Sequence, residues 1–250
     1  ICPGGDPATI TSSSAASGGN GSITYQWKKG SSVLASSNSV TFDPSISNGA
    51  GAYTREAKDA TCNTSFTAST GTWTVSEEAA PSSQASSFTS SSIGNTTATV
   101  GWTRGDGDEV VVVAKASSAP TTDPTNGTTY AADAAFGSGD ALSGGYVVYK
   151  GTGTSVSLTG LTAGVTYHIA VYENETSNSC NIYNSTQLTG SFTTASPAIS
   201  TSGSIGSFTA CNGVAGTSDN FSVSGVNLTA DITVTAPTGY EVSTDNSSFS

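Results

Sequence analysis

Few side chains in this sequence could carry catalytic chemistry. Its 250 residues include one histidine, His168, the only conventional base near neutral pH. His168 alternates with apolar residues across positions 165–172, so we interpret it as an outward-facing strand residue. No Gly-x-Ser-x-Gly segment marks a nucleophilic serine, and the acidic residues cluster locally instead of forming an opposed pair. We therefore expect a protein that is not an enzyme.

One acidic turn, residues 104–109, has two chemical interpretations besides the structural one. It begins with Arg-Gly-Asp, the tripeptide that integrins bind in animal matrix proteins, but its glycines favour a tight turn after a strand. Asp106, Asp108 and Glu109 offer oxygen ligands that suit calcium. The full spacing of a calcium loop is missing. We predict a turn, with calcium as the one cofactor candidate and no other metal.

The four cysteines, Cys2, Cys62, Cys180 and Cys211, form no Cys-x-x-Cys pair, and a single histidine leaves no credible zinc site. Cys2 and Cys62 fall near the two ends of the first predicted domain, so we expect a disulfide between them and an oxidising compartment. Cys180 and Cys211 flank the second domain boundary. They either pair with each other, or Cys211 has its partner beyond Ser250.

Composition indicates an all-β, extracellular chain. Hydrophobic residues make up 35% and charged residues 10%, while Val-, Thr- and Tyr-rich runs are divided by Gly, Asn and Ser. A net charge of −11 with seven Lys and Arg argues against nucleic-acid binding. No apolar run approaches the roughly 20 residues needed to cross a bilayer, so we expect no membrane insertion. Because the chain has no Met and stops within a predicted strand, we expect it to be part of a longer protein.

The first predicted domain covers residues 1–78, before a short linker at 77–83. Ile23, Tyr25 and Trp27 alternate with polar residues and so share one face of a strand. An early Cys, a Tyr-Gln-Trp strand and a late Cys resemble the Ig-like or PKD-like modules of bacterial surface proteins. The resemblance implies that Trp27 packs in a sandwich core.

The second predicted domain covers residues 84–195 and resembles a fibronectin type III domain. Ala98–Thr103 is similar to the second strand of that family, whose buried Trp corresponds to Trp102. Leu158–Tyr172 resembles the Leu-x-x-Gly-x-x-Tyr corner, which implies that Tyr167 is a core residue with its hydroxyl held by nearby backbone.

A long insert at residues 117–145 departs from that family. Taken whole, the domain resembles a variant found in large secreted proteins of Bacteroidetes that leave by type IX secretion, many of them gliding or attachment adhesins. Tyr130, Phe136 and Tyr146 around the insert are the candidate recognition residues. The insert either forms a platform for a surface glycan or covers an exposed strand.

Residues 196–250 predict the start of a third, incomplete β-sandwich module. The fold class is therefore all-β, with tandem Ig-like and fibronectin type III-like sandwiches. We predict a structural stalk of a surface adhesin, whose partners are neighbouring modules and surface glycans or other cell-surface proteins. The alternatives are a carbohydrate-binding accessory region of a secreted enzyme and a subunit of an extracellular filament.

Overall fold

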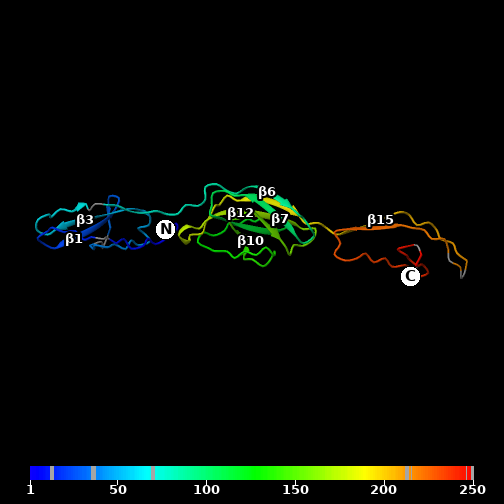
Figure 1. Cartoon of the computed structure of the whole chain (residues 1–250). Helices are drawn as coiled ribbons and strands as arrows, with labels where there is room; N and C mark the ends of the chain where they lie inside the picture. The colour runs from blue at the N-terminus through cyan, green and yellow to red at the C-terminus, as the bar shows by residue number, and fades with distance from the viewer. Residues whose placement is uncertain are drawn as a thin grey trace.

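The computed structural model describes residues 1–11, 14–34, 38–68, 71–211, 214, 216–245 and 247–248. Within this part of the chain, all regular elements are β-strands except one short 3-10 helix, η1, at Ser177–Ser179. Figure 1 shows the strands in three successive groups along an extended chain. The predicted all-β fold is confirmed. No helix among the described residues is both long and apolar enough to cross a membrane.

The first module is one antiparallel sheet with the order β2-β1-β3-β4, in which β5 also pairs with β3. Its strands are β1 (Ile23–Lys29), β2 (Ser32–Val33), β3 (Gly51–Asp59), β4 (Thr67–Ala68) and β5 (Trp73–Val75). The strand predicted around Phe42 is only a single antiparallel bridge between Phe42 and Ile10. These two residues pack against the sheet and form the second layer of the module.

Trp27 is the centre of the first module's core. Its side chain is fully buried and stacks on Phe42, with ring centroids 5.7 Å apart. Its indole nitrogen donates a hydrogen bond to the Ser39 carbonyl, so the ring is buried without leaving its polar atom unsatisfied. Tyr53 completes this cluster from β3. Trp27 is therefore buried in the core, on the strand face that the alternating sequence pattern predicted.

The second module is a two-layer sandwich. One sheet has the order β11-β7-β6, and the other has the order β13-β12-β8-β10-β9, with β14 paired to β12. This division of antiparallel strands between two sheets is the architecture that immunoglobulin and fibronectin type III domains share. The strands are β6 (Ser86–Ser91), β7 (Ala98–Thr103), β8 (Glu109–Ala116), β9 (Ala141–Leu142), β10 (Gly145–Gly151), β11 (Ser155–Leu158), β12 (Thr166–Glu175), β13 (Ile182–Tyr183) and β14 (Leu188–Thr193).

The core between these two sheets contains both predicted anchor residues. Trp102 is 5% exposed and contacts the ring of Tyr149, with centroids 5.5 Å apart. Tyr167 is 1% exposed, and its hydroxyl accepts a hydrogen bond from the Thr162 amide at 2.9 Å. The ring of Tyr167 also stacks on Phe192 of β14. Tyr167 therefore joins β12, β14 and the turn before β12.

The insert covers the outer face of the larger sheet, which makes β8 a strand buried on both sides. The alternate residues of β8 face the inter-sheet core, while Val111 and Val113 face outward into a second apolar cluster. The buried members of that cluster are Val111, Val113, Leu142, Val147, Ala170, Tyr172 and Tyr183. Antiparallel sheets often leave one face to water. Here the insert covers that outer face, so it is buried against protein.

The insert also closes one edge of the smaller sheet. Ala135 forms a parallel bridge with Thr159, just after β11. The Phe136 amide donates to the Thr159 carbonyl at 2.9 Å, and the Thr159 amide donates to the Ala134 carbonyl at 3.0 Å. Covering an edge in this way removes unpaired backbone groups that could otherwise pair with another chain.

The third group of strands is a two-stranded antiparallel sheet of β15 (Ala198–Ser202) and β16 (Ser222–Val226). Ile199 and Val226 are each 59% exposed on it. Two strands bury little apolar area by themselves. The described part of this region therefore lacks the packed core seen in the first two modules.

Candidate functional site

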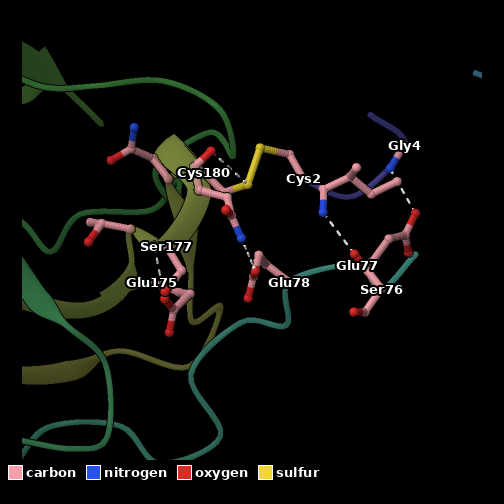
Figure 2. The surroundings of a disulfide bond; sticks show 12 residues. Cys2, Gly4, Ser76, Glu77, Glu78, Glu175, Ser177 and Cys180 are labelled. Carbon is pink, nitrogen blue, oxygen red and sulfur yellow. Dashed lines mark hydrogen bonds between the residues drawn. A yellow bond between two sulfur atoms is a disulfide. The ribbon is translucent and has the colours of Figure 1, made fainter. Parts of the chain in front are cut away.

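The junction between the first two modules holds a disulfide bond. Cys2 is bonded to Cys180, with an S–S distance of 2.09 Å and a Cα–Cα distance of 5.3 Å (Figure 2). The predicted bond between Cys2 and Cys62 is therefore wrong, and so is pairing of Cys180 with Cys211. Cys62 and Cys211 are both free and exposed.

The physical reason for this correction is the direction of β3. Gly51, at the start of β3, pairs with Val75, so the segment that follows β5 lies at this end of the sheet, next to Cys2. Cys62 follows Asp59, at the other end of the strand. A strand of this length spans about 25 Å. Cys2 and Cys62 are thus near opposite ends of the first module, and a disulfide needs Cα atoms within about 7 Å.

The segment that carries Cys2 is held against the end of the first module. The Ile1 nitrogen donates to the Ser76 carbonyl at 2.8 Å, and the Glu78 amide donates to the Ile1 carbonyl at 2.8 Å. The Gly4 amide donates to a Glu77 carboxylate oxygen at 3.0 Å. Figure 2 shows Gly4, Ser76 and Glu77 on the Cys2 side of the disulfide. Cys2 therefore moves with the first module.

Cys180 belongs to the second module in the same way. It follows β12 and the one-turn helix η1, and only 1% of its surface is exposed. Asn178 and Ser179 have φ angles of 53° and 61°, a left-handed conformation that asparagine adopts more easily than most residues. This tight reversal directs the chain back toward β13 and places Cys180 at the end of the module that faces Cys2.

The linker between the modules is docked onto the second module. The Asn178 side-chain amide donates to the Glu78 carboxylate, and the Asn184 side-chain amide donates to the Pro81 carbonyl at 2.9 Å. Asp106 accepts hydrogen bonds from the Ser82 hydroxyl at 2.5 Å and the Ser83 amide at 2.8 Å. These two bonds, the Ser82 hydroxyl first, lower the pKa of Asp106 below its usual range. The linker is therefore a bound segment and not a free tether.

The Arg-Gly-Asp turn faces the protein. The Arg104 guanidinium donates from Nε and Nη2 to Glu173, with the ion pair at 2.9 Å. Glu173 is fully buried and also accepts the Gly105 amide at 2.7 Å. Because Arg104 and Asp106 both bind groups of this chain, the turn holds the second module and the linker together.

The three calcium candidates have separate protein partners. Asp106 binds the linker, and Asp108 accepts bonds from the Thr176 amide and hydroxyl at 3.0 and 2.9 Å. The Thr176 amide bond is the main cause that lowers the pKa of Asp108. Glu109 lies 3.2 Å from the Lys150 ammonium. Among the described residues, no group of three or more metal-ligating side chains converges.

The structure brings together two of the three aromatic recognition candidates. Phe136 packs edge-on against Tyr146 and Tyr167, with centroids 5.2 and 5.0 Å away. Tyr130 contacts Tyr183 instead and belongs to the outer apolar cluster. All three rings are half-buried. Phe136 and Tyr130 thus fix the insert at two separate places on the sandwich.

Sequence reasoning did not find the buried carboxylate Glu173 or the pairing of Cys180. Glu173 follows Tyr172 on β12, where the sequence becomes polar, and the alternation considered in the sequence ended at Tyr172. The sequence feature that could have indicated a buried carboxylate is Arg104, the single arginine of the second module. It lies in a turn directly after the core strand with Trp102. For Cys180 the local sequence contains no comparable signal, because its partner belongs to another module.

Comparisons with known proteins give likenesses of fold. No protein-family model matches the chain, and no characterised protein matches it in sequence. A fibronectin type III domain of human collagen XX is 16% identical, with a TM-score of 0.29 over 48% of this chain and 99% of that one. A two-domain fibronectin type III segment of chicken tenascin is 18% identical, with a TM-score of 0.29 over 69% of this chain and 83% of that one.

A three-domain crystal structure of titin is also similar in part. It is 15% identical, with a TM-score of 0.36 over 64% of this chain, and this chain spans 50% of it. At such identities the likeness concerns the fold alone. The modular β architecture follows from the chain's own strands and sheets, and its function has to be argued from its own contacts.

Proposed function

We propose that this chain is a spacing region of an extracellular surface protein, which holds successive β modules in a fixed relative orientation. The observation that carries the proposal is the Cys2–Cys180 disulfide, which joins the first module to the second across a docked linker. The docked linker by itself is held by single hydrogen bonds at exposed or half-buried sites, which fix an orientation only weakly. A covalent bond beside the linker gives the pair two connections, so one module cannot swing about the other.

The disulfide also supports an extracellular location, because such bonds persist in oxidising compartments. The resemblance of residues 84–195 to modules of type IX-secreted Bacteroidetes proteins supports an attachment or gliding adhesin as the whole protein. In that role the partners of this region are its neighbouring modules, and a surface glycan or cell-surface protein is bound elsewhere. The half-buried contacts of Tyr130 and Phe136 favour a structural role for the insert over a glycan platform.

We predict that breaking the disulfide frees the first module from the second. Spin labels on the native Cys62 and on Thr152→Cys, in a Cys211→Ser background, report the distance between the two modules by electron paramagnetic resonance. We expect one narrow distance distribution with the disulfide intact and a broad one in the Cys2→Ser/Cys180→Ser variant. The reason is that the remaining hydrogen bonds between the second module and the linker lie at exposed or half-buried sites and each contributes little.

A second label pair controls for folding. Thr152→Cys with Ser191→Cys, in a background without Cys62 and Cys211, reports a distance within the second module, and it should stay narrow in both forms. If the distribution between modules is equally narrow without the disulfide, the linker alone sets the orientation and the proposal is wrong. A broad distribution in the intact protein contradicts it equally.

A further inference from the structure

The Cys2–Cys180 bond closes a covalent loop that contains most of the two folded modules. Its sequence separation is 178 residues. The loop includes all strands of the first module and, in the second, β6 to β12. β13, β14 and the third group of strands lie outside it.

We propose that this bond is a mechanical bypass: when the chain is stretched between its ends, tension passes directly from Cys2 to Cys180. The inference rests on the proposed spacing function, because a spacer on a cell surface is pulled along its length. A covalent loop cannot lengthen while its closing bond is intact. The first module and strands β6 to β12 therefore cannot be extended by the pull while the bond is intact, however weak their own folding is.

The load then falls on the segment after Cys180, and the fold places a suitable strand there. β14 pairs antiparallel with β12, from Thr166 opposite Thr193 to Val171 opposite Leu188. Cys180 follows the end of β12 that lies near Leu188, while the chain leaves the module beyond Thr193. A pull on the exit therefore runs along β14 and loads its hydrogen bonds together in shear, instead of opening them one after another.

Two buried residues fasten the C-terminal end of β14, where the chain leaves the second module. Phe192 is 5% exposed and stacks on Tyr167. Thr194 is 3% exposed, and its hydroxyl donates to the Thr162 carbonyl at 2.6 Å and accepts from the Val165 amide at 3.0 Å. The last residues of the second module are thus fastened to its core at the point where tension leaves it.

The test is to stretch single molecules of the full chain, held by tags at both ends, with and without a reductant. In the oxidised chain only the 70 residues after Cys180 can be released, which limits the gain in contour length to roughly 240 Å. Reduction should make a further length of about 600 Å available, in proportion to the 178-residue separation of the two cysteines.

The Cys180→Ser variant should show the long extension without reductant, and Cys62→Ser, which removes an exposed free thiol, should behave as the unmodified chain. Extension well beyond roughly 240 Å in the oxidised chain would overturn the bypass. So would an oxidised and a reduced chain of equal maximum extension. Both results leave the unloaded orientation measured with spin labels unaffected, so a failed bypass and a failed spacing function are distinguishable.

Discussion

Replacing Tyr167 by alanine is expected to lower the free energy of unfolding of the second module by about 3–5 kcal/mol. The ring is almost fully buried between Phe136, from the insert, and Phe192, from β14. Its removal leaves a cavity where the insert, β12 and β14 meet, and the Thr162 amide loses its acceptor. Hydrogen exchange of the β8 and β12 amides in the full chain measures this loss, because these central strands open only with the module.

Tyr167→Phe is the matched control for this prediction. It keeps the ring and removes only the hydroxyl that accepts a hydrogen bond from the Thr162 amide. The free energy of unfolding should therefore fall by about 1 kcal/mol. If alanine and phenylalanine cost the same, packing of the ring contributes nothing. The account of Tyr167 as the residue that joins β12, β14 and the insert would then be wrong.

Removal of the buried carboxylate of Glu173 should have an effect of similar size. Breaking a buried ion pair by deleting one partner typically costs about 3–5 kcal/mol, since the other charge stays buried without compensation. In Glu173→Ala, the Arg104 guanidinium loses its carboxylate partner and keeps its bond to the Gly107 carbonyl. The Gly105 amide loses its acceptor. We expect reduced exchange protection throughout the second module and loss of the ordered turn at 104–109, which also releases Ser82 and Ser83 of the linker from Asp106.

The double variant Arg104→Ala/Glu173→Ala separates coupling from simple truncation. Since each single change leaves one charge or donor unpaired, the double variant should lose clearly less stability than the sum of the two. Glu56→Ala in the first module is the control for a more exposed pair: Glu56 lies 3.1 Å from Lys28, and its loss should cost less than about 1 kcal/mol. Additive losses at Arg104 and Glu173 would show that they do not stabilise the module as a pair.

The sequence predicted the parts of the fold that depend on short-range pattern. Alternation placed Trp27 and Tyr167 on the faces where the structure has them buried. The run Val110–Val113 was a further signal, because a strand without polar alternation has both faces covered. We did not predict a cover from this run. In the structure the insert supplies the cover over the outer face of β8.

The disulfide could not be predicted from the same patterns. Positions of cysteines within one domain favour pairing across that domain, and Cys2 with Cys62 satisfied this expectation. What decides the outcome is that β3 carries Cys62 to the far end of the first module, while the segment with Cys2 is hydrogen-bonded beside the linker. The contact between modules depends on Asn178, Asn184 and Asp106, which bind backbone and carboxylate groups of the linker. Such polar contacts leave no periodic signal in sequence.

The junction account depends most directly on which cysteines are bonded, and peptide mapping without reduction measures this. Lys150 is the last lysine or arginine, so trypsin leaves Cys180 and Cys211 in one peptide and a second digestion with chymotrypsin is needed to separate them. We predict one linked pair of peptides, containing Cys2 and Cys180, with Cys62 and Cys211 recovered as thiols. A peptide pair that links Cys2 to Cys62, or Cys2 recovered as a free thiol, would contradict the account.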